Sequence, residues 1–390
     1  MLLIKNGYLK TMAGEDIENG DILIKEDRIL QIGSSIHCPK DQDVQVIDVN
    51  GALVMPGIIE CHCHIGITEE KKGSEGDDGN EVTNPITPFL RAIDGINPMD
   101  AAFHDAIQAG ITTVLVGPGS SNVVGGQFAV LKTYGRVLDK MIVKAPAAMK
   151  IAFGENPKKN FGDKDKMPAT RMAIAFLLRE ELTKAKNYLA KKEEAKKNNE
   201  AFEIDIRYDC WEPVFAKKIP LKAHVHRTDD IITAIRIAKE FDLNMTLDHC
   251  SEGHLIADYI KESGYPAIVG PNLASRNKIE VQNAAFKTAG VLQREGVLLT
   301  ITTDHPVTLV QSLPICAGLA AKAGLGVENA YKAMTINAAK IIGLDHLIGS
   351  LEVGKIANIA IYNGNPMETL TKTLYTIIDG VVRYDYKKAD

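Results

Sequence analysis

"PLKAHVHRTDDIITAIRIAKEFDLNMTLDHC", residues 220–250, contains two short apolar runs separated by a segment with helical spacing. The runs "PLKAHVH" and "NMTLDHC" have the composition of buried strands. Between them, Ile231, Ile235 and Ala238 recur along one stripe of a helix. A strand, a helix and a second strand in this order favour a parallel βαβ unit. The stretch therefore predicts an α/β fold.

The same alternation recurs on both sides of this stretch. The run "DAAFHDAIQAG" predicts a helix that begins after Asp100 and stops at Gly110, and the strand-like "ITTVLVGP" follows it. Two further strand-like runs, "YPAIVGP" and "VLLTITTDHP", each follow a helical segment. So many strands alternating with helices predict a (β/α)8 barrel, also called a TIM barrel.

The two ends of the chain have a different texture. Residues 1–55 and 348–390 contain short β-type runs, which Gly, Asn and Asp turns separate in the first of these segments. We expect the two segments to pair into one small β domain. Residues 56–347 would then form the barrel, inserted between the two halves of that domain.

Composition limits the class of protein. The 390 residues are 45% hydrophobic and 24% charged, with a formal net charge of -5. This mildly acidic balance gives no reason to expect nucleic acid or an anionic membrane as a partner. The six cysteines stand singly, which is typical of reduced thiols, and the opening "MLLIKNGYLK" is too charged for a signal peptide. We therefore expect a cytoplasmic protein.

Two histidines stand one residue apart in "GIIECHCHIGI", residues 57–67. Successive side chains of a strand point to opposite faces, so His62 and His64 share one face of this run. Two imidazoles on one face can converge on a single metal ion. Taken alone, the pair also allows the alternative of two separately hydrogen-bonded core histidines.

Other imidazole and carboxylate groups also stand at or just after the ends of apolar runs: His224, His226, His249, Asp304 and Glu155. A barrel collects the side chains at the carboxyl ends of its strands on one rim. A cluster of such groups would be costly there without a cation to share. Zn2+ and similar ions accept this mixture of nitrogen and oxygen ligands. The coincidence of positions therefore predicts a metal site at the rim.

These motifs resemble those of the amidohydrolase superfamily, and within it the imidazolonepropionase-related hydrolases. The resemblance covers essentially the whole chain and rests on "VMPGIIECHCHIG" at 54–66, "LKAHVH", "LDHC", "TTDHP" at 302–306 and the tail "IGSLEVGKIANIAIYNGNP". It implies a distorted (β/α)8 barrel beside a β-sandwich built from the N- and C-terminal segments. It also implies a site with one or two divalent ions.

Carried over by position, the resemblance assigns the metal ligands strand by strand. His62 and His64 look like the first-strand ligands, and His224 and His249 look like those of the fifth and sixth strands. Asp304 resembles the aspartate of the eighth strand. The first-strand motif of the superfamily usually reads Asp-x-His-x-His, and here Glu60 stands in the Asp place, which can change the hydrogen bonding behind the ligands.

Many members of the superfamily bridge two ions with a carboxylated lysine or a glutamate. In this chain Lys150 and Glu155, both in or beside "AMKIAFGE", compete for that role. Lys150 lies about five residues, or ~17 Å of extended chain, before the expected end of the strand. Glu155 lies at that end, so we expect Glu155 to be the bridging ligand.

The chemistry that this site predicts is a metal-dependent hydrolysis of a C–N bond in a cyclic amide, an N-acyl compound or a small peptide. A bound metal makes hydroxide available from water at neutral pH. Asp304 is expected to act as general acid and base, taking a proton from the water and passing it to the leaving nitrogen. His226 faces the same way as His224 and is expected to contact the substrate, and the pattern also allows it to bind the metal or to lie behind the ligands.

Two other classes of function are compatible with the pattern. A deaminase of a nitrogen heterocycle usually needs one ion and no bridging carboxylate, and a binding protein without activity could use the same scaffold. Two Zn2+ ions are the expected cofactors, although His and carboxylate ligands also suit Mn2+ or Fe2+. The expected partner is a small-molecule substrate, and relatives suggest a homo-oligomer.

Overall fold

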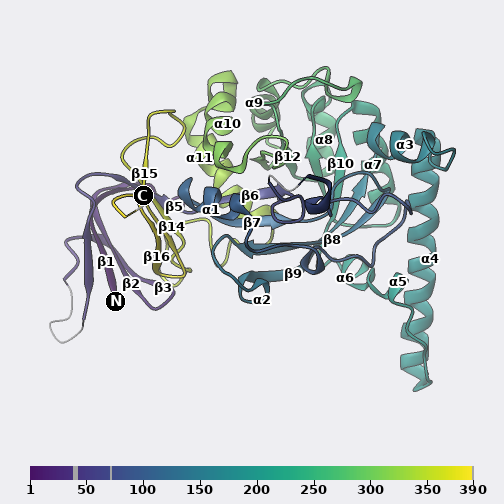
Figure 1. Ribbon diagram of the computed structural model, residues 1–390, viewed down its shortest axis with the longest axis horizontal. Helices are drawn as coiled ribbons and strands as arrows, with labels where there is room; N and C mark the ends of the chain where they lie inside the picture. Colours follow the sequence, from purple (N-terminus) through teal and green to yellow (C-terminus); the bar gives the residue numbers. More distant parts are fainter. Residues whose placement is uncertain (38–42, 71–72, 389–390) are drawn as a thin grey trace.

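The computed structural model describes residues 1–37, 43–70 and 73–388, and within them the strands form two eight-stranded sheets (Figure 1). One sheet forms the barrel. The other forms a β-sandwich domain at one end of the barrel, and Figure 1 shows its strands coloured by both extremes of the sequence. The predicted fold class, a distorted (β/α)8 barrel with a small β-sandwich from the N- and C-terminal segments, is confirmed.

The barrel sheet follows the order of the sequence. Its strands are β6 (Ile58–Cys63), β7 (Ile111–Val116), β8 (Val124–Lys132), β9 (Ile142–Ala152), β10 (Leu221–Val225), β11 (Met245–His249), β12 (Ala267–Val269) and β13 (Leu299–Ile301). Strand β8 runs antiparallel to β7 and β9, whereas the other neighbours pair in parallel. This reversed strand is one way in which the barrel departs from the regular (β/α)8 pattern.

The two end strands of this sheet meet at their carboxyl ends. The backbone N–H of His64, just after β6, donates to the carbonyl oxygen of His305, beyond β13, at 2.9 Å. The parallel strands therefore present their carboxyl ends around one common rim, which is where barrel enzymes place their functional side chains.

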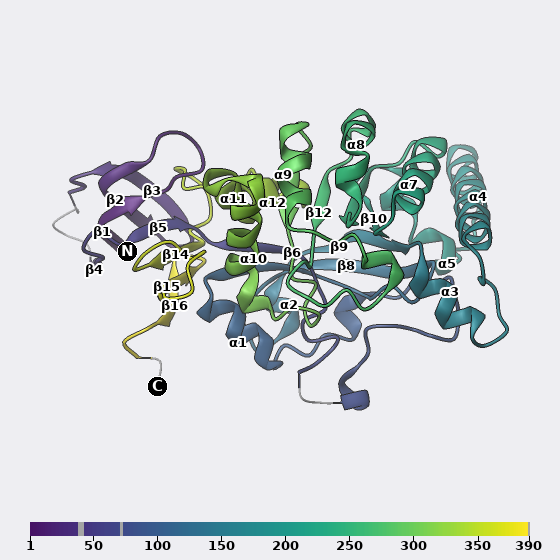
Figure 2. The same cartoon turned by 90° about the horizontal axis from the view of Figure 1, so that it is seen from above.

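The described α-helices lie between the barrel strands or after the last of them, with four of them between β9 and β10. They are α1 (Ala101–Gln108), α2 (Leu138–Met141), α3 (Glu155–Gly162), α4 (Arg171–Asn198), α5 (Ile206–Asp209), α6 (Glu212–Phe215), α7 (Thr228–Glu240), α8 (Ala257–Ser263), α9 (Lys287–Arg294), α10 (Leu313–Ala320), α11 (Val327–Met334) and α12 (Ile336–Ile341). Figure 2 shows α4, α7, α8 and α9 in a row along one side of the barrel sheet. None of the described helices combines the length and apolar composition that crossing a membrane requires.

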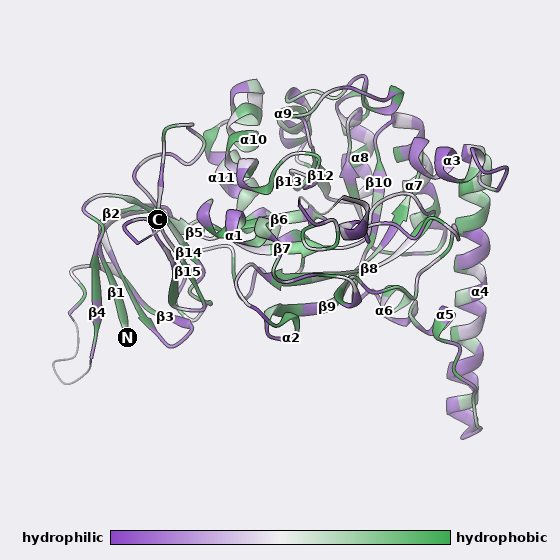
Figure 3. Cartoon of the chain, in the orientation of Figure 1, coloured by the Kyte–Doolittle hydropathy of each residue, from purple (hydrophilic) through white to green (hydrophobic). Residues whose placement is uncertain are grey.

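Helix α7 has the buried stripe that its sequence predicts, since Ile231, Ile235 and Ala238 are all fully buried. The longest helix, α4, buries residues mainly in its first half, including Leu178 and Leu182. Its far end extends beyond the barrel and is mostly hydrophilic (Figure 3). The first half of the helix is therefore packed into the core, whereas polar contacts such as those of Lys192 with Asp209 and Glu212 hold the second half.

The second sheet joins the two ends of the chain. It contains β1 (Leu2–Leu9), β2 (Ile17–Lys25), β3 (Arg28–Ser34), β4 (Gln45–Asp48) and β5 (Leu53–Pro56) from the first segment, and β14 (Ile359–Tyr362), β15 (Thr373–Ile378) and β16 (Val381–Asp385) from the last. Strand β5 pairs with β14 in antiparallel fashion, and this pairing connects the halves. Chain segments more than 300 residues apart thus share one apolar core.

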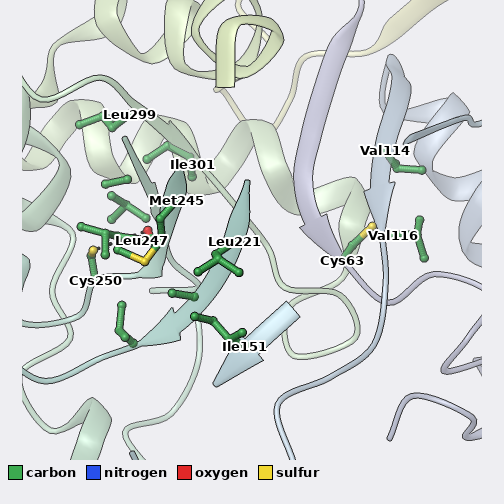
Figure 4. Packing of buried hydrophobic residues seen from close by; sticks show 14 of the residues in the cluster. Cys63, Val114, Val116, Ile151, Leu221, Met245, Leu247, Cys250, Leu299 and Ile301 are labelled. Carbon is green, nitrogen blue, oxygen red and sulfur yellow. Dashed lines mark hydrogen bonds between the residues drawn. The ribbon is translucent and has the colours of Figure 1, made fainter. Parts of the chain in front are cut away.

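Alternation along the barrel strands separates the apolar core from the site. Leu221, Ala223 and Val225 of β10 belong to the large apolar cluster, whereas Lys222 and His224 occupy the alternate positions. Figure 4 shows Leu221 packed in this cluster with side chains from neighbouring strands. The core holds the strands rigidly, so that the alternate side chains are presented at fixed positions.

Gly110 fixes the contact between the barrel and the sandwich, and it gives a test of the fold. It has a φ of +80° after α1, and a Cβ there would collide with the hydroxyl of Tyr362 on β14, which donates to Ala109 O at 2.8 Å. We expect Gly110→Ala to lower the free energy of unfolding by about 2–4 kcal/mol, because strain and overpacking add. Gly264→Ala is the matched control, since Gly264 has a φ of +76° with open space around it. Equal losses in denaturant titrations of the two variants would contradict the role of the Tyr362 contact.

Candidate metal centre

A cavity of about 1260 Å³ opens at the carboxyl ends of the barrel strands. Among the residues that line it are six that the sequence predicts for the site: His62, His64, His224, His226, His249 and Asp304. They come from β6, β10 and β11 and from the segments that directly follow β6, β10 and β13. The fold therefore brings together side chains that are far apart in the sequence.

These side chains form two clusters. The first cluster contains His62, His64 and Asp304, and the second cluster contains His224, His226 and His249. Within each cluster the nitrogen and oxygen atoms that could bind a metal lie within 4.8 Å of one another. The clusters adjoin, because the ring centroids of His62 and His249 are 4.9 Å apart.

Hydrogen bonds at Nδ1 orient three of the rings. His62 Nδ1 donates to the Asp248 carboxylate at 2.9 Å. His64 Nδ1 and His249 Nδ1 donate to the backbone carbonyl oxygens of Gly117 at 2.7 Å and Gly270 at 2.8 Å. Such bonds fix which nitrogen carries the proton and leave Nε2 of each ring with a lone pair for a metal.

Three of the clustered histidines, His62, His226 and His249, are in the protonation state that binds a metal. Burial, together with the ammonium groups of Lys150 and Lys222, lowers the pKa of His62 to about 4. Burial also lowers the pKa of His226 to about 3 and that of His249 well below its ordinary value. Neutral imidazole is the form that coordinates metal ions.

One buried atom shows directly that the cluster suits a cation. His249 Nε2 has no hydrogen-bond partner among the described residues, although it is inaccessible to solvent. A buried acceptor without a partner costs about 1–3 kcal/mol. A divalent ion bound by His249 and its neighbours would remove this cost, so the residues present fit such an ion.

Asp304 connects to both histidines of the first cluster. Its Oδ1 lies 3.3 Å from His62 Nε2 and 3.2 Å from His64 Nε2. Burial raises the pKa of Asp304, but the adjacent imidazoles of His62 and His64 outweigh burial and hold the pKa well below its ordinary value. The carboxylate is therefore ionised at neutral pH.

Two of these residues have an unusual backbone. Asp304 has a φ of +51° and His249 a φ of +75°, a region that side-chain-bearing residues adopt rarely. Such conformations cost of order 1–3 kcal/mol and cluster at functional sites, where surrounding structure holds them in place. Asp304 belongs to the first cluster and His249 to the second, so each cluster contains one such residue.

The structure places the two candidates for the bridging ligand differently. The buried Nζ of Lys150 is 3.4 Å from His62 Nε2. Glu155 belongs to neither cluster and is not among the described residues that line the cavity. Strand β9 ends at Ala152, only two residues after Lys150. The chain turns at Gly154, with a φ of +83°, and Glu155 begins α3.

Two buried charges behind the site were not predicted from the sequence. Asp248 accepts the hydrogen bond from His62 Nδ1, and its Oδ2 also lies 3.2 Å from Lys222 Nζ. Lys222 precedes His224 by two residues on β10, so alternation along this strand would have placed both on the same face. These charges orient His62 from behind rather than lining the cavity.

A third unpredicted residue is Glu280, which is almost fully buried. It lies in a short 3-10 helix, Ile279–Val281, between β12 and α9. Its Oε1 is 3.8 Å from His224 Nε2 and 3.9 Å from His226 Nε2. No periodic pattern marks this segment, so the sequence offers no signal for it.

Glu60, which replaces the expected aspartate, ties the first strand to the last. Its carboxylate accepts hydrogen bonds from Thr302 Oγ1 at 2.7 Å and from the backbone N–H and hydroxyl of Thr303 at 2.8 and 2.7 Å. It also accepts from the backbone N–H of His62 at 3.0 Å. The longer acid therefore lies behind the ligands and fixes the backbone on both sides of the first cluster.

The sequence model of the amidohydrolase family matches residues 53–383 of the chain. The chain belongs to the amidohydrolase family. It is therefore an enzyme of the hydrolase class, as the motifs at the strand ends predict. The two clusters occupy the rim at which the members of this family are expected to hold their divalent ions.

Known relatives span almost the whole chain. A crystal structure of an amidohydrolase from Thermotoga maritima is 39% identical, with a TM-score of 0.95, and covers 99% of this chain and 100% of its own. Imidazolonepropionase from Sphingopyxis alaskensis is 25% identical over 385 residues, which are 93% of this chain and 92% of that protein. Amidohydrolase tasK from Hapsidospora irregularis is 23% identical over 94% of this chain, but the chain spans only 40% of that protein's length.

Proposed function

We propose that this amidohydrolase uses two divalent metal ions to hydrolyse a C–N bond in a cyclic amide, an N-acyl compound or a small peptide. The observation that carries the proposal is the pair of adjoining clusters in one cavity. Two-ion sites, with ions about 3.5–4 Å apart, are typical of enzymes that add water to a substrate. The likeness to an imidazolonepropionase supports the cyclic amide among these substrates.

The first cluster would hold one ion and the second cluster the other. Zn2+ suits these ligands best, and Mn2+ or Fe2+ could replace it. Lys150 is the bridging ligand in this proposal, because its Nζ lies beside His62 whereas the Glu155 carboxylate lies in neither cluster. To serve so, the uncharged Lys150 amine would bond to the carbon of CO2 and release a proton, giving a carboxylate at the end of the side chain.

When bound, the ions would lower the pKa of a water molecule and polarise the carbonyl group of the substrate. Asp304 would accept the proton of the attacking water and donate it to the leaving nitrogen. Its carboxylate is ionised and belongs to the first cluster, as a general base at this place has to be. Glu60 would hold the backbone around His62 and Thr303 in position, and Asp248 would orient the His62 ring.

The outer wall of the cavity favours a polar small molecule. It includes Asn80, Ser120, Asn156 and Asn160, together with the cationic Lys159. Part of this wall is the Gly- and Ser-rich segment between β7 and β8. Side-chain amides and hydroxyls of this kind orient the peptide-like groups of a substrate by hydrogen bonds.

The activity test separates this function from its alternative, a deaminase. Zinc-loaded protein is incubated with panels of cyclic amides, N-acyl amino acids, dipeptides and aminated heterocycles. We expect a new carboxylate and a new amine from at least one amide panel. Release of free ammonia from a heterocycle, with no amide cleaved, would contradict the proposal and support the deaminase.

The bridging ligand is tested by metal content. We expect about two ions per chain in the wild type, and loss of at least one in Lys150→Ala, because the two ions lose their shared carboxylate. Glu155→Ala is the matched control and should keep both ions. The substitution removes only the side chain, and the backbone N–H of residue 155 can still donate to Glu280 Oε2. Mass spectrometry of the dialysed proteins measures the ions. Loss of ions in Glu155→Ala but not in Lys150→Ala would reverse the assignment.

A further inference from the structure

A buried carboxylate that the mechanism above does not use lies against the second cluster. Glu280 is 1% exposed, and its Oε1 has no hydrogen-bond partner among the described residues. Leaving a buried charged acceptor unpaired is costly, more so than for a neutral group. A cation at this atom would remove the cost.

The distances around Oε1 suit a metal ion. His224 Nε2 lies 3.8 Å away and His226 Nε2 lies 3.9 Å away. Bonds of about 2.0–2.2 Å from zinc to nitrogen and oxygen place neighbouring ligand atoms roughly 3.3–3.7 Å apart. A shift of a few tenths of an ångström would therefore let all three atoms contact one ion. His249, stacked on His226 with ring centroids 4.7 Å apart, supplies a further nitrogen.

The surroundings of Glu280 hold its carboxylate at this place. The backbone N–H of Glu155 donates to Glu280 Oε2 at 2.8 Å, which leaves Oε1 for another partner. Gly154 packs so closely that a Cβ there would lie 2.7 Å from Oε2 and 3.0 Å from Asp230 Oδ2. The turn at Gly154 directs the Glu155 side chain away from the site. The backbone N–H of Glu155 at the same turn holds the Glu280 carboxylate beside the second cluster.

The nearest cation does not satisfy Glu280 by itself. Lys278 Nζ is 3.6 Å from Oε1, beyond a hydrogen bond, and it already donates to Asn156 Oδ1 at 2.6 Å. Lys278 is also partly exposed, so it balances the buried charge only weakly. An ion at the second cluster would lie between Glu280 and the imidazoles and neutralise the carboxylate directly.

We propose that Glu280 is a metal ligand, and that it binds the second divalent ion, such as Zn2+, together with side chains of the second cluster and the bridging Lys150. Of the roles that the sequence allows for His226, this one selects the metal. The proposal rests on the second ion of the proposed function. It adds a carboxylate from the segment between β12 and α9 to the ligands at the strand ends.

The test is Glu280→Gln, which keeps the shape of the side chain and removes its charge. Wild type and variant are loaded with Zn2+ or Co2+, dialysed against a graded series of chelator concentrations, and assayed for metal content. We expect the variant to bind the second ion at least about 100-fold more weakly, since loss even of a residue behind a ligand costs 10–100-fold. The visible absorption of bound Co2+ should change together with the metal content.

Glu181→Gln is the matched control. Glu181 is also a buried carboxylate, but it accepts a hydrogen bond from Trp211 Nε1 at 2.9 Å and lies outside the cavity. Its variant should keep the affinity of the wild type for both ions. Should Glu280→Gln fail to fold, His226→Gln tests the same ion from another element, with the same expected loss.

The outcomes distinguish this proposal from the function on which it rests. Unchanged affinity for two ions in Glu280→Gln, or in His226→Gln where that variant serves as the test, overturns the ligand assignment and leaves the two-ion hydrolase standing. A wild type that binds only one ion overturns the two-ion function instead. In that case a loss of this one ion in Glu280→Gln still supports Glu280 as a ligand.

Discussion

Replacing His62 and His64 together with alanine should lower kcat/KM by about 10⁴-fold or more, because the ion of the first cluster loses two of its ligands. A metal ion contributes several kcal/mol of transition-state stabilisation, and each 1.36 kcal/mol corresponds to a factor of ten in rate. The two side chains are held in place by Asp248 and by Gly117 O, so the wild-type site is organised before an ion binds. Metal content and initial rates on a cleaved substrate measure the effect.

The same strand offers a control for this double variant. Cys61 and Cys63 alternate with the two histidines on β6 and belong to apolar clusters. Cys61→Ala with Cys63→Ala should keep both ions and most of the activity, while lowering stability modestly. The His62 and His64 variant should also unfold cooperatively. If it is folded and keeps two ions with full activity, the first cluster is not a metal site.

The strand-end part of this site could be predicted because simple rules place it. Alternation puts His62 and His64 on one face, and the parallel barrel gathers His224, His249 and Asp304 at one rim. Both rules need only local sequence, because the alternation of side chains and the apolar runs that mark each strand are visible within a few residues. The predicted fold class and family were confirmed for the same reason.

The remaining features depend on contacts that a single sequence does not display. Strand β8 begins at Val124, inside a Gly-rich segment, although glycine usually weakens strands. Gly126 is needed there, since a Cβ would lie 2.5 Å from Leu90 O. Glu280 enters the site from an irregular segment, so neither helical nor strand periodicity could identify it.

The position of the proposed bridging ligand shows how one turn changes a site. The expectation for Glu155 depended on a strand that continued to that residue. Gly154 ends this continuity with its positive φ, and the chain enters α3. As a result Lys150, two residues before the end of β9, is the side chain that reaches His62. The residue at which this strand ends therefore decides which of the two candidates lies beside His62.

Asp304→Asn should lower kcat by about 10²–10⁴-fold, the usual contribution of a positioned general acid and base. The amide has nearly the shape of the carboxylate but cannot accept a proton from water. The change leaves the hydrogen bond from the Asp304 backbone N–H to Thr302 Oγ1, at 3.0 Å, so the strained backbone should persist. We expect KM to change much less than kcat, because the lost step follows substrate binding.

Metal content separates the two roles that Asp304 has in this site. A variant that keeps both ions and loses kcat assigns the residue to proton transfer. A variant that loses the ion of the first cluster assigns it to metal binding, and added Zn2+ should then restore part of the rate. Retention of full kcat with both ions bound would exclude Asp304 from the chemistry.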